Sequence, residues 1–460
     1  LNSDAMSILS IPVEILSAIF ELSKTMANED SLSLAYEGPK MVPEIIYSQI
    51  CIGLRNVALT TPRLWTSIYI DAAVSSAERI PEYIRRSGVC LLDIRVDLAA
   101  EDAYAGKSGL DSMIDLIVDN SLRWRSVSAE CTCERADRPI MTHICKSTAR
   151  RLQHLSLDIE DVEQADPSAV NREIGFPHIF KDGAPKLKFV RLKGLAIQFF
   201  RPPFDAVVTL HLEQTSQVPL AYITFRNIIT RSSVLAHLSI HGDIIDNISW
   251  SRFTDVIILP HLLSLRICGE GGNIYSGLLM GIKAPLLKSL TLKDVQEHDL
   301  DAMFDSTSSS QYNNLRQLVF TNFELSGSTY RRIFHTFREI TSFSSVQSSI
   351  AESPLIDTLV KDTSQGQTNY SAFWPNLAVL AFSFGDDEVD EEMIQELRNV
   401  RASHGLPLPK IRLRVEPDEM QDATAMVRGD INTAIEIFFQ DEAWPPNCDH
   451  IDSDDVLFSW

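Results

Sequence analysis

Residues 284–294 read APLLKSLTLKD and contain the six-residue frame Leu287-x-x-Leu290-x-Leu292. The frame recurs, and the starts of its first seven clear copies lie 20 to 35 residues apart. The other copies are Leu152/Leu155/Leu157, Leu187/Val190/Leu192, Val207/Leu210/Leu212, Leu235/Leu238/Ile240, Leu262/Leu265/Ile267, Leu315/Leu318/Phe320 and Leu377/Leu380/Phe382. The last two apolar positions of a copy are two residues apart, so in an extended segment both side chains point into a core. The residues between copies must form a return arm, because a tight turn cannot connect parallel strands.

A period in the twenties with an L-x-x-L-x-L core is the sequence signature of leucine-rich repeats. We therefore predict an α/β fold, an open leucine-rich-repeat solenoid with a parallel sheet inside and helices outside. Weaker copies of the strand pattern are Leu92/Ile94/Val96, Trp124/Val127/Ala129, Ile340/Phe343/Ser345 and Ile411/Leu413/Val415. Helical patterns are predicted at residues 81–87, 111–120, 221–230, 273–282, 330–337 and 391–400.

Composition and charge narrow the class of protein. The chain has 460 residues, 45% of them hydrophobic, and a formal net charge of −21. This charge argues against nucleic acid and against an anionic membrane surface as partners, because both are bound through basic residues. The seven cysteines are sparse and odd in number, which favours reduced thiols in a cytoplasmic or nuclear protein. No apolar run is long enough to span a membrane, and residues 1–16 lack the pattern of a signal peptide.

The N-terminal residues predict a small helical module. Residues 11–20 read IPVEILSAIF, with Ser10 placed as an N-cap and apolar residues at helical spacing. A polar loop is predicted at 24–42 and a second helix at 43–59, which ends before Pro62. The apolar stripe of the first helix has two interpretations: it binds a partner, or it packs on the first repeat.

The stretches IPVEILSAIF at 11–20 and ALTTPRLW at 58–65 closely resemble the F-box of the large fungal F-box/leucine-rich-repeat family. Residues 86–94 resemble the same family's junction into its repeats. The resemblance implies docking onto a Skp-type adaptor and, through it, onto a cullin complex. The adaptor-binding residues implied are Pro12, Glu14, Ile15, Leu16, Ile19, Phe20, Ile50 and Leu54. The family's middle helix usually carries basic residues and a Trp after its Cys, whereas residues 51–55 here read CIGLR, with Leu54 at the Trp position.

Alternation along the strands predicts a second surface. If Leu155 and Leu157 point into the core, the residues beside them point to the concave face of the solenoid, where such proteins bind their partners. The target-binding candidates on this face are Arg191, Lys193, His211, His237, His241, Arg266 and Lys293. Its four Arg and Lys residues make the face relatively basic and suited to an acidic or phosphorylated peptide. Contact with water alone also explains polar residues there.

No constellation of residues predicts catalysis, a cofactor or a metal. Cys131, Cys133, His143 and Cys145 are the nearest approach to a zinc site, but they lack the usual C-x-x-C spacing, and buried free thiols explain them better. The predicted domains are a helical F-box-like module at 1–70, the repeats at 71–415, and a C-terminal cap with an acidic tail at 416–460. The cap is predicted as an amphipathic helix at 430–440.

Three functional hypotheses follow. In the first, the chain is the non-catalytic substrate receptor of a Skp/cullin-type ubiquitin ligase, and the concave face binds a target protein. In the second, it is an interaction scaffold that does not recruit a cullin, which the departure at Leu54 favours. The third, an enzyme built on the solenoid, needs a convergent polar cluster that the sequence does not provide.

Overall fold

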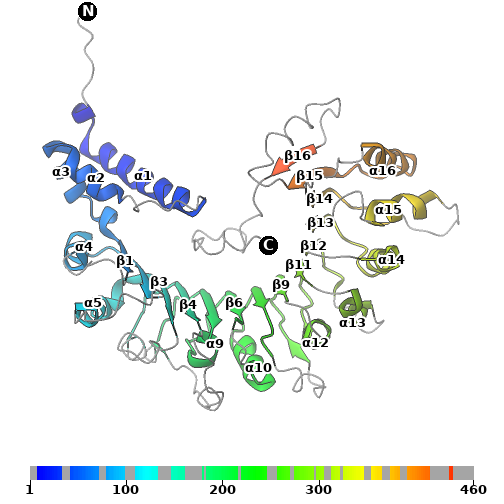
Figure 1. The fold of residues 1–460 in the computed structure, drawn as a ribbon, viewed down its shortest axis with the longest axis horizontal. Helices are drawn as coiled ribbons and strands as arrows, with labels where there is room; N and C mark the ends of the chain where they lie inside the picture. Colours follow the sequence, from blue (N-terminus) through cyan, green and yellow to red (C-terminus); the bar gives the residue numbers. More distant parts are fainter. Residues whose placement is uncertain are drawn as a thin grey trace, which may run out of the picture. The chain divides into compact units, whose positions relative to one another are not determined.

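The computed structural model describes residues 8–33, 42–71, 79–98, 109–132, 144, 147–160, 179–180, 183–215, 219–245, 256–269, 274–294, 297–304, 312–321, 325–346, 354–364, 373–383, 391–414 and 435–438. The described residues form two compact units, the first within residues 1–206 and the second within residues 207–446. Both units are mixed α/β structures in which parallel strands carry helices on one side (Figure 1).

The first unit begins with a helical module, residues 8–65. Its elements are a 3₁₀ turn Ile8–Ser10, α1 Val13–Ser33, α2 Pro43–Ile50, α3 Ile52–Leu59 and a 3₁₀ turn Pro62–Trp65. The prediction of one helix over 43–59 is wrong, because Cys51 is extended (φ −155°, ψ 167°) and its Sγ accepts a hydrogen bond from the Leu54 N–H that starts α3. The predicted loop at 24–42 is also wrong in part, since α1 continues to Ser33.

Parallel strands follow the module in chain order. The elements of this part are β1 Ser67–Asp71, α4 Arg79–Ser87, β2 Leu92–Leu98, α5 Gly109–Val118, β3 Trp124–Thr132, β4 His154–Glu160, β5 Phe189–Gly194 and α9 Ala196–Phe199. The pairing of β1 with β2 places Ile68 beside Ile94. The sheet therefore starts within the stretch that the sequence assigned to the helical module, before the predicted boundary at residue 70.

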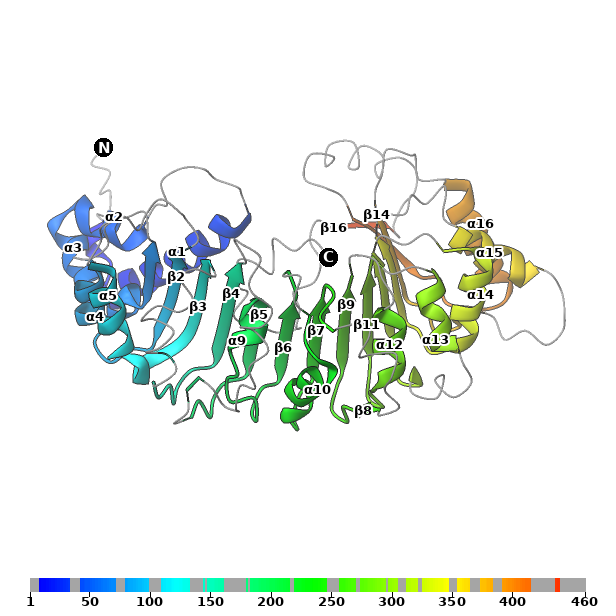
Figure 2. The ribbon, with the colours of Figure 1, turned by 60° about the horizontal axis from the view of Figure 1, so that its bottom comes forward.

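The second unit repeats the arrangement of strand and return arm. Its sheet strands are β6 Thr209–Glu213, β7 His237–His241, β9 Ser264–Cys268, β11 Ser289–Lys293, β12 Gln317–Thr321, β13 Ser342–Val346, β14 Val379–Ser383, β15 Lys410–Arg414 and β16 Ile435–Phe438. A separate small sheet pairs β8 Ile257–Ile258 with β10 Ile282–Lys283. The helices are α10 Tyr222–Arg231, α12 Ile274–Gly281, α13 Asp301–Phe304, α14 Gly327–Thr336, α15 Pro354–Ser364 and α16 Glu391–Ser403. Figure 2 shows β6, β7, β9 and β11 side by side.

The repeated frame explains this register. Leu290 of β11 lies between Leu265 of β9 and Leu318 of β12, and all three are at most 2% exposed. The same alignment continues through β13 to Phe343, in the weaker copy that the sequence identified. Matching apolar positions therefore stack into columns that form the core between the strands and the helices.

The predicted C-terminal helix over 430–440 is contradicted where the structure describes it. Residues 435–438 form strand β16, which pairs with β15 so that Ile435 lies beside Ile411 and Ile437 beside Leu413. Alternating β-branched residues fit a strand, and pairing with the exposed edge of β15 outweighs the helical spacing seen in the sequence. Val415 and the rest of the predicted cap and acidic tail lie outside the described residues.

Gly242, directly after β7, holds a turn that a side chain would break. Its φ is +75°, and a Cβ there would lie 2.3 Å from the backbone oxygen of Gln214. We expect Gly242→Ala to lower the free energy of unfolding by about 2–3 kcal/mol, through backbone strain and this clash. Gly405→Ala is the control, because Gly405 has φ +68° but no atom within 4 Å of the added Cβ. Chemical unfolding followed by circular dichroism measures both, and equal losses would contradict the role of the clash.

Candidate docking surfaces

The first helix of the module has an inner face. Leu16 and Phe20 are 2% and 5% exposed, and the Phe20 ring stacks on Tyr47 of α2 with centroids 4.2 Å apart. Leu54 of α3 is also only 5% exposed. The expectation that these three residues contact an adaptor directly is therefore corrected: their side chains form the core of the module. Among the predicted residues, only those with exposed side chains on the same helices are available for direct contact with a partner.

An outer apolar row runs along the same helix. Ile15, Ile19, Leu22 and Met26, spaced four, three and four residues apart, are 52%, 46%, 62% and 54% exposed. We call these four residues the apolar stripe, since this spacing places them on one side of a helix. The sequence identified only the first two, although continuing the same spacing past Phe20 would have found the others.

Further exposed residues flank the apolar stripe. Of the predicted adaptor-binding residues, Pro12 and Glu14 are exposed at the start of α1, and Ile50 is 60% exposed at the end of α2. The sequence did not single out Ile46, which is 37% exposed, or Ile52 at the start of α3, which is 75% exposed. Soluble proteins rarely gather so many large exposed apolar side chains without a binding role.

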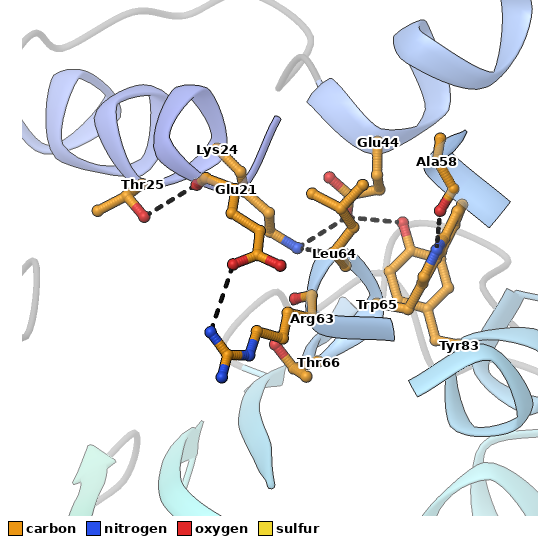
Figure 3. Close-up of polar contacts among 10 residues, drawn as sticks. All are labelled: Glu21, Lys24, Thr25, Glu44, Ala58, Arg63, Leu64, Trp65, Thr66 and Tyr83. Carbon is orange, nitrogen blue, oxygen red and sulfur yellow. Dashed lines mark hydrogen bonds and ion pairs between the residues drawn. The ribbon is translucent and has the colours of Figure 1, made fainter. Parts of the chain in front are cut away.

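A buried ion pair holds the helices of the module together (Figure 3). Lys24 Nζ lies 3.1 Å from Glu44 Oε1 and donates a second hydrogen bond of 2.6 Å to the backbone oxygen of Leu64. Glu44 Oε1 also accepts from the hydroxyl of Tyr83 at 3.1 Å, while Oε2 accepts no hydrogen bond from the residues that the structure describes. The side chains of Lys24 and Glu44 are only 10% and 3% exposed, so water hydrates neither charged group well. These contacts join α1 and α2 to α4.

Trp65 makes the second junction between the module and α4. Its Nε1–H donates to the Ala58 oxygen at 2.9 Å, and its ring meets Tyr83 edge-on with centroids 5.1 Å apart. The guanidinium of Arg86 lies 4.2 Å from the centre of the Trp65 ring, and a hydrogen bond to Glu82 holds Arg86 there. The TPRLW stretch therefore packs the module against the first helix after β1.

Tyr83 offers a spectroscopic test of this junction. Burial, followed by the negative charge of Glu44, raises the pKa of Tyr83 from 10.0 to about 12. The protonated hydroxyl is thus favoured in the folded state, so its stabilising contribution is complete below pH 10 and is lost as the pH rises toward 12. We expect the tyrosinate absorbance of the wild type minus that of Tyr83→Phe, read immediately after a pH jump, to have its midpoint near pH 12. A midpoint near 10 would mean that the hydroxyl is not buried against Glu44.

In the first unit, the side of the strands away from the helices is polar but closely packed. Arg191 of β5 is 4% exposed, and Lys193 Nζ lies 2.7 Å from Asp158 of β4. His154 stacks on Phe189 with ring centroids 3.9 Å apart. The expectation of an open face is therefore wrong at Arg191. Side chains in register on neighbouring strands are close enough to cover one another.

The second unit carries the other five target-binding candidates. His211 is 7% exposed, and Glu213 beside it faces His241 of β7 across 3.7 Å. Burial and, secondarily, the charge of Arg266 lower the pKa of His237, which keeps this imidazole neutral. Arg266 and Lys293 are half-buried on β9 and β11. His211 of β6 lies beside Ser239 of β7, the strand that carries His237 and His241, but its side chain is too buried to be an exposed contact.

The candidate zinc ligands can be placed only in part. Cys131 is a buried free thiol on β3, whereas Cys133, His143 and Cys145 lie outside the described residues. Within the described ranges, no group of three or more His, Cys, Asp or Glu side chains could hold a metal ion. No helix among the described segments combines the length and apolar character needed to cross a bilayer.

A scan against models of known protein families found no match, and a search among curated proteins found none either. The structural class is that of an α/β protein with parallel strands and a helical module at its N-terminal end.

Proposed function

We propose that this chain is the substrate-receptor subunit of a Skp/cullin-type ubiquitin ligase. The helical module is then an F-box that binds the adaptor, and the parallel strands with their return arms are leucine-rich repeats. The observation that carries the proposal is the exposed apolar stripe of α1, which begins with Ile15 and Ile19 in the stretch that resembles the F-box. The chain itself would catalyse no reaction.

The apolar stripe has the properties of a helix-docking surface. Its four side chains are about half exposed, and burying an aliphatic side chain fully stabilises a complex by roughly 1.5–3 kcal/mol. A helical face of this kind is buried by laying it into a groove or against helices of a partner. Exposed Ile50 and Ile52, at the junction of α2 and α3, extend the apolar surface available to the adaptor.

The buried ion pair supports the receptor function because it fixes the module against α4. Lys24, Glu44 and Tyr83 connect the module to α4 through hydrogen bonds of 3.1 Å, so the module is packed against the beginning of the sheet. A receptor accelerates ubiquitin transfer by proximity, and proximity requires that the bound target be held at a defined position. Target binding is assigned to the polar side of the strands, with half-buried Arg266 and Lys293 as contacts in the second unit.

The second candidate is an interaction scaffold that recruits no cullin. One observation favours it: Leu54, where the resembled family usually has a Trp, is 5% exposed and sits in the module core. An aromatic contact with the adaptor is therefore missing at this position. The two candidates make different predictions for cullin recruitment.

Reconstitution separates the two candidates. The full chain is mixed with its host's Skp-type adaptor and the matching cullin, and the mixture is separated by size-exclusion chromatography. A receptor co-elutes with the cullin only when the adaptor is present. Co-elution with neither protein, by a chain whose circular dichroism shows it folded, would leave the scaffold as the function.

A further inference from the structure

A cluster of basic side chains lies at the N-terminal ends of β4 and β5, on the edge of the first unit. Arg150 and Arg151 precede β4, and Lys186 and Lys188 precede β5. All four side chains are exposed. We call these four residues the basic edge.

Backbone hydrogen bonds hold the two turns of the basic edge together. The N–H of Ala149 donates to the oxygen of Gly183 at 3.3 Å, and the oxygen of Gln153 accepts from the N–H groups of Lys188 and Phe189 at 2.9 and 3.1 Å. The two strands run side by side (Figure 2), and in their register His154 lies beside Phe189. Because neighbouring strands lie about 4.8 Å apart, the four basic residues are crowded onto two adjacent turns.

At the start of β3, the neighbouring strand, two arginine side chains have hydrogen-bond partners within the chain. Arg123 donates to the Cys90 oxygen at 3.0 Å and to the Ser87 hydroxyl at 2.7 Å. Arg125 pairs with Asp93, with its Nε 2.9 Å from the carboxylate. Within the described ranges, the four side chains of the basic edge make no ion pair or hydrogen bond of this kind.

Such a cluster is unusual on a chain with a net charge of −21. Like charges on adjacent turns repel each other, and a protein rich in carboxylates offers many ways to neutralise them. Complementary charge on a partner removes this repulsion on binding and speeds the encounter. We propose that the basic edge is a docking site for a short acidic segment of a partner protein, rich in Asp and Glu.

The observations favour a short acidic peptide over nucleic acid. The basic edge covers only two turns, whereas duplex DNA carries one charge per roughly 1.7 Å and would extend onto the acidic remainder of the protein. Such a long polyanion is repelled by the net charge of −21. A segment with a few carboxylates fits within the two turns.

The test measures fluorescence anisotropy of a labelled peptide of alternating Glu and Ser, with the full chain, at low salt. Lys186→Glu/Lys188→Glu removes two cations and adds two anions on the basic edge. The matched control is Lys283→Glu/Lys288→Glu, the same change in net charge at two exposed lysines of the second unit. We expect the first variant to weaken binding by about tenfold or more and the control to change it by no more than about twofold. Raising the salt should weaken wild-type binding, because exposed charges are screened.

Several outcomes would overturn the proposal. Equal loss in both variants would mean that only net charge matters, and equal binding of a peptide with Gln in place of Glu would exclude charge recognition. Tighter binding of a single-stranded oligonucleotide, lost in the same variant, would make the edge a nucleic-acid surface instead. If Lys186→Glu/Lys188→Glu does not fold, Lys186→Gln/Lys188→Gln replaces it in the same binding experiment. The experiment contains no adaptor, so its failure and that of the proposed ligase function are independent.

Discussion

Replacing Ile15 and Ile19 by Asp should abolish binding to the Skp-type adaptor while the chain stays folded. The two side chains are 52% and 46% exposed, so a carboxylate at either position remains hydrated in the free protein. In the complex both carboxylates would be buried without partners, at a cost of several kcal/mol, in addition to the lost burial of two Ile side chains. We expect affinity to fall by about a hundredfold or more, as measured by isothermal titration calorimetry.

The controls for this double variant come from the same exposure data. Ile223 of α10, 53% exposed in the second unit, provides Ile223→Asp, which should bind the adaptor like the wild type. Leu16→Asp should instead disrupt the module itself, because Leu16 is 2% exposed. If Ile15→Asp/Ile19→Asp binds as tightly as the wild type, the apolar stripe is not the docking surface.

The second large effect concerns the buried ion pair. Among the described residues, Lys24→Met leaves Glu44, 3% exposed, with the Tyr83 hydroxyl as its one hydrogen-bond partner, and Glu44→Gln removes the counterion of Lys24. Removing one member of a buried pair typically costs about 3–5 kcal/mol, because an uncompensated charge stays buried. We expect a loss of this size for each single variant, in chemical unfolding of the full chain followed by circular dichroism.

A double variant and an exposed pair complete that experiment. Lys24→Met/Glu44→Met should recover most of the loss, since two well-packed apolar side chains can replace a buried pair. Arg63→Gln breaks the pair with Glu21 at 3.5 Å, in which Arg63 is 76% exposed, and should cost about 0.5 kcal/mol or less. A loss below about 1 kcal/mol for both single variants would show that the pair does not hold the module together.

The strands were the most predictable part of the fold. The frame at Leu287, Leu290 and Leu292 fixes both the alternation of side chains and the position of the return arms, so repetition compensates for the weakness of each copy. Strand β13 was found through Phe343 even though its last frame position is Ser345, which is 1% exposed. The first strand, Ser67–Asp71, was missed although Trp65, Ile68 and Ile70 have the spacing of the frame, because these residues were assigned to the helical module.

Local spacing failed where a distant contact decides. Residues 430–440 have helical spacing, but residues 435–438 pair with β15 as a strand. The polar end of α1 was predicted as a loop because nothing in the sequence shows that Lys24 finds Glu44 and the Leu64 oxygen. Cys51 ends one helix and caps the next within a stretch of uniform helical pattern.

The exposure of the candidate site residues was predicted only in part. Helical spacing places Leu16 and Phe20 near Ile15 and Ile19, but which of two adjoining faces packs on α2 depends on tertiary structure. Arg191 and His211 were expected on an open face because they alternate with core residues, yet both are less than 8% exposed. Alternation identifies the side of a sheet, and burial on that side depends on the neighbouring strands.

One titration tests the central claim most directly. The Skp-type adaptor is titrated into the folded wild-type chain by calorimetry at several temperatures. A receptor should give one-to-one binding with a negative heat-capacity change, the mark of apolar surface buried on association. The absence of binding heat at every temperature, with no complex in size-exclusion chromatography, would contradict the assignment of the α1 stripe as an adaptor-binding surface.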